Sequence, residues 1–101
     1  MPQLIKISWR DIPSQVIAKN GRNKAKVQLS TRFQKAIDRA AMKAGRQGSD
    51  EYLDDWQRSY KKCEGELTEL AHAAAEQLEL DYPDERLEAL VRSRGLEEIP
   101  S

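Results

Sequence analysis

A change in the spacing of the apolar residues, at about residue 30, is the feature that most restricts the fold of this sequence. Before that point, apolar and polar side chains alternate, most clearly in residues 5–10, which read IKISWR. Alternation with a period of two is typical of a strand with one buried face. After that point, apolar side chains recur every three or four residues, which is typical of helices. We therefore predict an α+β fold in which an N-terminal sheet packs against C-terminal helices.

The N-terminal part is predicted to form three strands in a small, mostly antiparallel sheet. Pro13 is expected to interrupt the first alternation, because proline lacks the amide donor that a central strand needs. Asn20-Gly21 predicts a hairpin turn, since both central residues of a type I′ turn need positive φ. Beyond this turn, Lys24 and Lys26 alternate with apolar residues. The sheet is therefore expected to have one basic face.

Three or four helices are predicted for the C-terminal part. Ser30 is expected to begin the first one, because its hydroxyl can accept a hydrogen bond from a free amide at the helix end. Gly45 is expected to end it, since glycine tolerates the left-handed backbone that follows many helices. Between them, five apolar residues form one stripe: Phe33, Ile37, Ala40, Ala41 and Ala44.

A second helix is expected to begin at Ser49 or Asp50. The apolar residues that follow step by three or four positions, as in one long helix or in two shorter ones: Leu53, Trp56, Tyr60, Cys63, Leu67, Leu70 and Ala74. An interior glycine costs about 1 kcal/mol relative to alanine, so we expect a break near Gly65. A last helix is expected from Pro83 to Gly95, with three buried residues, Leu87, Leu90 and Val91.

The length of 101 residues fits a single domain covering residues 1–101. We expect the sheet in residues 4–30, the helices in residues 31–95 and a tail in residues 96–101. The sequence shows no signal peptide and no apolar run of about 20 residues, the length that a membrane span needs. A single cysteine, Cys63, excludes an internal disulfide. These features predict a cytoplasmic protein without a membrane partner.

Residue types suited to catalysis or metal binding are few. A nucleophile, a base and an orienting group must lie within reach of one another, and the chain has one histidine, His72, besides Cys63. These two cannot supply the four ligands of a structural zinc site. Asp54 and Asp55 would point about 100° apart on a helix, so helix capping explains them better than acid–base chemistry. We therefore expect a non-enzymatic protein without a metal or cofactor.

The zero net charge of the chain hides a strong asymmetry. Residues 1–48 contain eleven Lys or Arg and two acids, a balance of +9. Residues 49–101 contain six Lys or Arg and fifteen acids, a balance of −9. Opposite charges of this size either compensate each other within one fold or face different partners.

Two features make nucleic-acid binding an alternative to protein binding. Basic residues cluster around the predicted hairpin and along the first predicted helix, as phosphate binding requires. Residues 45–48, Gly-Arg-Gln-Gly, also resemble the GXXG loop of KH domains, which clamps a nucleic-acid backbone. Against this alternative, acids follow the loop, no strand is expected after the second helix, and Trp9 and Phe33 are expected in the core rather than free for base stacking.

Two segments resemble a known bacterial family. They are residues 9–16, Trp-Arg-Asp-Ile-Pro-Ser-Gln-Val, followed by Gly21-Arg22, and residues 40–45, Ala-Ala-Met-Lys-Ala-Gly, followed by Tyr52-Leu53 and Trp56. With these segments, about residues 4–92 of the chain resemble the virulence factor domain family. The family domain also occurs in conserved virulence factor C proteins, beside HEAT-type helical repeats. The resemblance implies an interaction or accessory role and brings no catalytic residues with it.

The candidate binding residues are all charged: Arg10, Asp11, Arg22, Lys24, Lys26 and Arg46. The first two stand at a strand end, where they form either a binding corner or a local salt bridge that shapes the turn. Three others surround the hairpin, and the last lies in the GXXG-like loop. We expect the basic N-terminal face to dock an anionic partner, with a protein favoured over nucleic acid. An accessory role in a larger enzyme is a further alternative.

Overall fold

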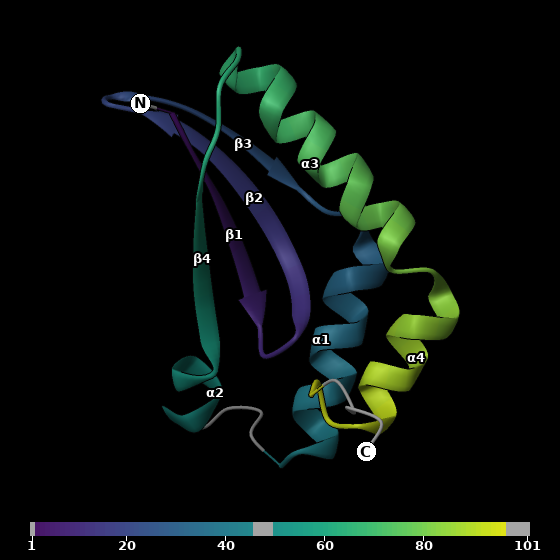
Figure 1. The fold of residues 1–101 in the computed structure, drawn as a ribbon. Helices are drawn as coiled ribbons and strands as arrows, with labels where there is room; N and C mark the ends of the chain where they lie inside the picture. Colours follow the sequence, from purple (N-terminus) through teal and green to yellow (C-terminus); the bar gives the residue numbers. More distant parts are fainter. Residues whose placement is uncertain (1, 46–49, 97–101) are drawn as a thin grey trace.

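One antiparallel sheet organises the fold (Figure 1). The computed structural model describes residues 2–45 and 50–96. The strands are β1 (Gln3–Trp9), β2 (Ile12–Asn20), β3 (Asn23–Gln28) and β4 (Trp56–Lys62), in the spatial order β3-β2-β1-β4. The helices are α1 (Thr31–Lys43), α2 (Asp50–Asp54), α3 (Leu67–Asp81) and α4 (Asp84–Arg92). The predicted α+β class is confirmed, and the sheet has one strand more than predicted.

The three longer helices cover only part of the sheet. In Figure 1, α3 runs alongside β2 and β3, and it contacts both strands. Helices α1 and α4 pack against each other near the end of the sheet at which β1 ends and β2 begins. There, α1 also contacts β2. The helical layer therefore lies over the half of the sheet formed by β2 and β3.

The N-terminal hairpin forms as predicted, but β2 begins earlier than expected. Gly21 has a φ of 62°, and Asn20 pairs with Asn23 across the turn. Pro13 does not interrupt the strand, because β2 already begins at Ile12. The pairing of β1 with β2 shifts register beside Pro13, and such a bulge accommodates a residue without an amide donor.

The prediction of a helix after Asp54 is wrong, because a strand follows instead. Helix α2 contains five residues, and β4 then pairs antiparallel with β1 along its whole length. The apolar spacing in this segment does not mark a buried stripe, since Tyr60 is 60% exposed. A helix does begin just after Gly65, which has a φ of 133°, but the element before it is β4 and not the helix that was expected there.

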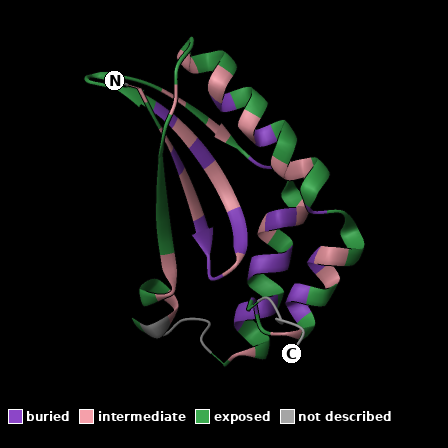
Figure 2. Ribbon diagram, viewed as in Figure 1, coloured by how far each residue is buried: buried purple, intermediate pink, exposed green. Residues whose placement is uncertain are grey.

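The core lies between the sheet and the helices (Figure 2). Trp9, Ile12 and Val16 of the strands and Phe33 and Ile37 of α1 are at most 1% exposed. The three residues predicted to be buried in α4 are buried: Leu87, Leu90 and Val91. In Figure 2, by contrast, β4 is exposed along most of its length.

Trp9 closely contacts Gly95, which lies just after the end of α4. Its indole N–H donates to the carbonyl of Tyr52 at 3.0 Å, which fixes the ring from one side. On the other side lies Gly95, with a φ of 84°. A Cβ atom added to Gly95 would lie 2.7 Å from Cζ3 of Trp9, closer than real side chains approach.

Replacing Gly95 with alanine should therefore strongly destabilise the fold. We expect the Gly95→Ala variant to lose about 3 kcal/mol of unfolding free energy, from the clash together with the left-handed backbone. The matched control is Gly21→Ala, since Gly21 also has positive φ but no atom within 4 Å of an added Cβ. It should lose only about 1 kcal/mol, the cost of the backbone conformation. Urea denaturation checks both values, and equal losses would contradict the close contact.

Candidate functional site

Side chains of catalytic type are dispersed in the structure. His72 is exposed on α3, and Cys63 is half buried just after β4, outside the main core. Within residues 2–45 and 50–96, no group of three or more His, Cys, Asp or Glu side chains is placed to hold a metal ion. In the same ranges, no helix is both long and apolar enough to cross a membrane. The charged surfaces of the sheet and of α1 are the stronger candidates for a site.

Arg10, a predicted binding residue, lies inside the fold. Its side chain is 9% exposed, and its guanidinium contacts the Asp55 carboxylate at 3.2 Å. The guanidinium also donates to the carbonyl of Arg94 at 2.7 Å. The backbone N–H of the following residue, Asp11, donates to the carbonyl of Gly95 at 2.8 Å. Arg10 therefore forms a salt bridge at this corner, but its acid is Asp55, 45 residues along the chain, and the pair is not the local one that was considered.

Ion pairs connect the basic first half of the chain to the acidic second half. In each of them, the base comes before residue 49 and the acid after it: Arg10 with Asp55, Arg32 with Glu79 and Asp84, and Arg39 with Glu88. Part of the charge asymmetry is thus compensated within the fold. The two arginines of α1 serve the packing of α3 and α4 and are neutralised there.

Glu79 of α3 makes several of the contacts that join the two halves of the chain. Its carboxylate accepts hydrogen bonds from the backbone N–H and the hydroxyl of Ser30, both at 2.8 Å, and pairs with Arg32 at 3.0 Å. Burial raises the pKa of Glu79, but the bonds from Ser30 and the charge of Arg32 outweigh burial, so the pKa lies below its usual value. Ser30 is the N-cap residue of α1, as predicted, but its hydroxyl makes no capping bond to the helix and donates to Glu79.

The sheet surface that points away from the helices carries a different set of residues. Val16 and Ala18 of β2 pack into the main core with Ala71 of α3. The residues that alternate with them must therefore point to the other side. The strand register aligns them in three rows across β3, β2, β1 and β4. We call this surface the open face, and its rows are Lys24-Lys19-Gln3-Lys62, Lys26-Ile17-Ile5-Tyr60 and Gln28-Gln15-Ile7-Arg58.

Positive charge dominates the open face. Its rows hold five Lys or Arg, all exposed, and no Asp or Glu. None of these five cations forms an ion pair with another residue that the structure describes. Lys19 and Lys24 are direct partners on neighbouring strands, an arrangement in which like charges destabilise a sheet. An acidic ligand on this surface would relieve that repulsion.

Apolar side chains occupy the centre of the open face. The middle row places Ile17 and Ile5 between Lys26 and Tyr60. Ile5 is 8% exposed although it does not belong to the main core, so its neighbours on the open face cover it. The Tyr60 side chain remains largely exposed. An apolar centre within a charged rim is the common anatomy of protein interfaces.

The structure brings together only some of the predicted binding residues. Lys24 and Lys26 lie on the open face, and Arg22 is exposed in the turn beside them. Arg10 and Asp11 lie at the other end of β2. The predicted site at Arg46 lies outside the described residues.

Three residues of the open face were missed by the sequence analysis: Arg58, Tyr60 and Lys62 of β4. The apolar spacing around them favoured a helix. The signal that points to a strand is weaker, because both faces of β4 are polar and only its aromatic residues favour β-structure.

One comparison with known proteins gives a match. Residues 7–91 match the family model described as virulence factor, which confirms the resemblance drawn from the sequence. No curated protein and no solved structure matches the chain.

The geometry of Glu79 predicts a pH-dependent contribution to stability. Since its pKa is lowered in the folded state, its stabilisation is complete above the pKa of the unfolded chain and is lost as the pH falls through the folded value. Glu79→Gln should cost about 1–2 kcal/mol near neutral pH and almost nothing in strong acid. Glu76→Gln, an exposed change on the same helix, is the control and should cost little at either pH. Urea denaturation across pH tests this, and a loss at Glu79 that persists in acid would contradict it.

Proposed function

This chain belongs to the virulence factor domain family, and because that membership specifies no reaction, we propose its function from its surfaces. The protein is an interaction module whose open face docks an acidic surface of a partner protein. The observation that carries this proposal is the set of five exposed cations on that face, with no acid in its three rows.

The contrast with α1 supports this choice of surface. Arg32 and Arg39 were part of the basic cluster in the sequence, but acids of α3 and α4 neutralise them. The five cations of the open face form no ion pair with another residue that the structure describes. A surface of one sign steers partners of the opposite sign and raises the rate of encounter.

The apolar centre favours a protein as the partner. Ile17 and Tyr60 offer surface that a protein can cover with its own apolar residues, and tyrosine is enriched among residues that dominate binding energy. The four strands span only about 15 Å, at roughly 4.8 Å between neighbours. An interface of this size is smaller than the roughly 800 Å² per partner of a standard complex. We therefore expect a transient complex that weakens as salt is added.

Nucleic-acid binding is the second candidate, and Tyr60 is the observation that favours it. An exposed aromatic ring on a basic sheet can stack against a base of a single strand. The expectation that no strand follows the second helix was also wrong, since β4 follows α2. However, α2 has five residues, and residues 46–48 of the GXXG-like loop lie outside the described residues. One exposed ring on this face is a small platform for stacking.

Charge reversal on the open face tests the proposal. The variant Lys24→Glu, Lys26→Glu, Arg58→Glu should lose its protein partner when the tagged chain is purified from its native cells at low salt. Affinity for that partner, once identified, should fall at least about tenfold, because attraction becomes repulsion at three positions. The control is Lys35→Glu, Lys43→Glu, which reverses two exposed charges of α1.

The outcomes separate the two candidates. Loss of the partner with the open-face variant, and its retention with the α1 variant, would support docking on the open face. Equal loss with both variants would show that overall charge, and not this surface, controls binding. Recovery of nucleic acid in place of a specific protein, with affinity that falls steeply with salt, would favour the second candidate.

A further inference from the structure

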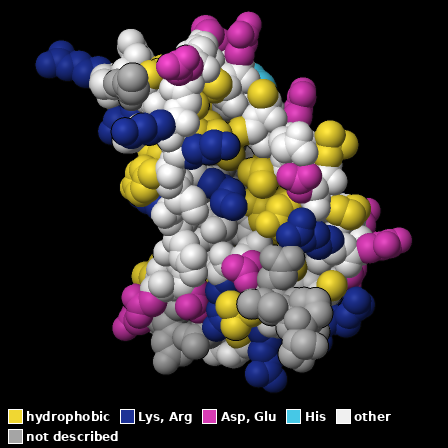
Figure 3. Space-filling view, in the orientation of Figure 1, with side chains coloured by type: hydrophobic (Ala, Val, Ile, Leu, Met, Phe, Trp, Pro, Cys, Tyr) yellow, Lys and Arg dark blue, Asp and Glu magenta, His cyan; other side chains and the backbone are white. Residues whose placement is uncertain are grey.

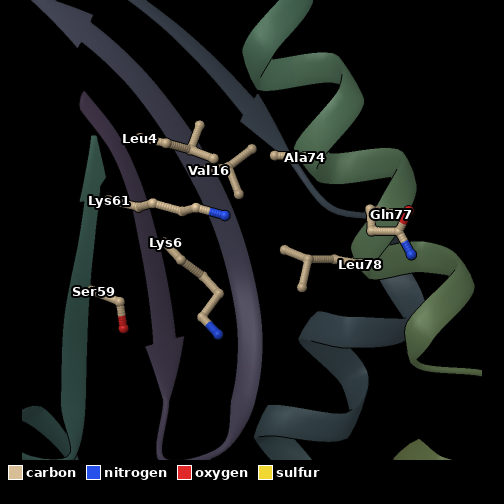
Figure 4. A pocket seen from close by; sticks show the side chains of 8 residues that line it. All are labelled: Leu4, Lys6, Val16, Ser59, Lys61, Ala74, Gln77 and Leu78. Carbon is tan, nitrogen blue, oxygen red and sulfur yellow. The ribbon is translucent and has the colours of Figure 1, made fainter. Parts of the chain in front are cut away.

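A groove lies on the opposite side of the sheet from the open face, between α3 and the strands β1 and β4. Its volume is about 360 Å³. Leu4 and Val16 form its floor, and Ala74 and Leu78 of α3 form one wall (Figure 4). In Figure 3, apolar side chains are exposed between the strands and α3, with Lys or Arg side chains beside them.

The groove exists because α3 covers only half of the sheet. Helix α3 packs against β2 and β3. A helix is about 10 Å across with its side chains, and strands lie about 4.8 Å apart, so one helix covers about two strands. The surface over β1 and β4 therefore has room for a second helix beside α3.

Two lysines give the groove its charge. In Figure 4, the side chains of Lys6 of β1 and Lys61 of β4 lie over the strands, on the side of the sheet that faces α3. Neither forms an ion pair with another residue that the structure describes, and no acid lines the groove. An occupant that covers the apolar floor also removes water from these ammonium groups. Burying a charge without a partner is costly, so the occupant must supply carboxylates.

We propose that this groove binds an acidic amphipathic helix of a partner protein. The apolar face of that helix packs on Leu4, Ala74 and Leu78, and its acids pair with Lys6 and Lys61. Grooves of this kind bind apolar side chains that are spaced three or four residues apart on one face of a helix. Strand β1 has seven residues, about 20 Å, which corresponds to about 14 residues of helix at a rise of 1.5 Å.

The shape of the groove favours a helix over a small amphiphile. Several of its lining residues are exposed, among them Ser59, Lys61 and Gln77. Pockets for small ligands bury most of the ligand surface, which this open groove does not do. The site is separate from the open face, because Lys6 and Leu4 lie on the other side of β1 from Ile5.

Selection from a displayed library of helical peptides tests this proposal on the full chain. The library fixes an apolar stripe in peptides of about 16 residues, two more than the groove length requires. It varies the flanking positions among Glu, Gln and Lys. We expect selection of Glu at the positions that flank the stripe. Binding of the selected peptide should weaken at least about tenfold with Lys6→Glu, Lys61→Glu.

A charge swap separates loss of binding from loss of folding. The double variant should prefer the same peptide with Lys in place of Glu, which a misfolded chain cannot do. Lys24→Glu, Lys26→Glu changes only the open face and should leave peptide binding unchanged. The proposal would be overturned if the selection did not enrich Glu, or if Lys6→Glu, Lys61→Glu left the affinity for the peptide unchanged. Tighter binding of dodecanoate than of the peptide would also overturn it.

Discussion

The burial of Trp9 and Arg10 at the end of β1 is the constraint on which the arrangement of the fold depends. The indole of Trp9 bonds to Tyr52 and packs against Gly95, while Arg10 reaches Asp55 and the carbonyl of Arg94. One corner thus joins the first turn of the sheet to the start of β4 and the end of α4. Arg10 has a φ of 52°, which costs about 1–2 kcal/mol in a residue other than glycine. The buried ion pair and hydrogen bonds offset this cost and keep the corner in place.

The distribution of charge follows from which elements the fold brings together. Acids of α3 and α4 reach the two arginines of α1, so these two charges are paired, whereas Lys35 and Lys43 of the same helix are exposed. The five cations of the open face lie on the side of the sheet that points away from the helices, and its rows contain no acid. Because α3 covers only β2 and β3, the sheet also leaves an apolar groove flanked by Lys6 and Lys61. Both proposed docking surfaces therefore arise from the same incomplete covering of the sheet.

The sequence predicts the elements whose apolar pattern matches their burial. The stripe of α1 and the hairpin at Gly21 are recognisable because one face of each is buried and the other is not. Strand β4 has no such contrast, since it lies at an edge and both of its faces are polar, and its apolar spacing imitates a helix. The basic hairpin was predictable from Lys24 and Lys26, but the full open face was not, because register across four strands is a property of the folded sheet. The partners of Ser30 and Arg10 lie 49 and 45 residues away, beyond the reach of any local pattern.

The central claim is that the fold pairs the arginines of α1 with acids and leaves the cations of the open face free to attract anions. Nuclear relaxation of each backbone amide by an anionic nitroxide, compared with a neutral nitroxide of the same size, measures this directly. The account predicts a higher ratio of anionic to neutral relaxation at Lys24, Lys26 and Tyr60 than at Arg32 and Arg39. Equal ratios on the two surfaces, or a higher ratio along α1, would contradict it.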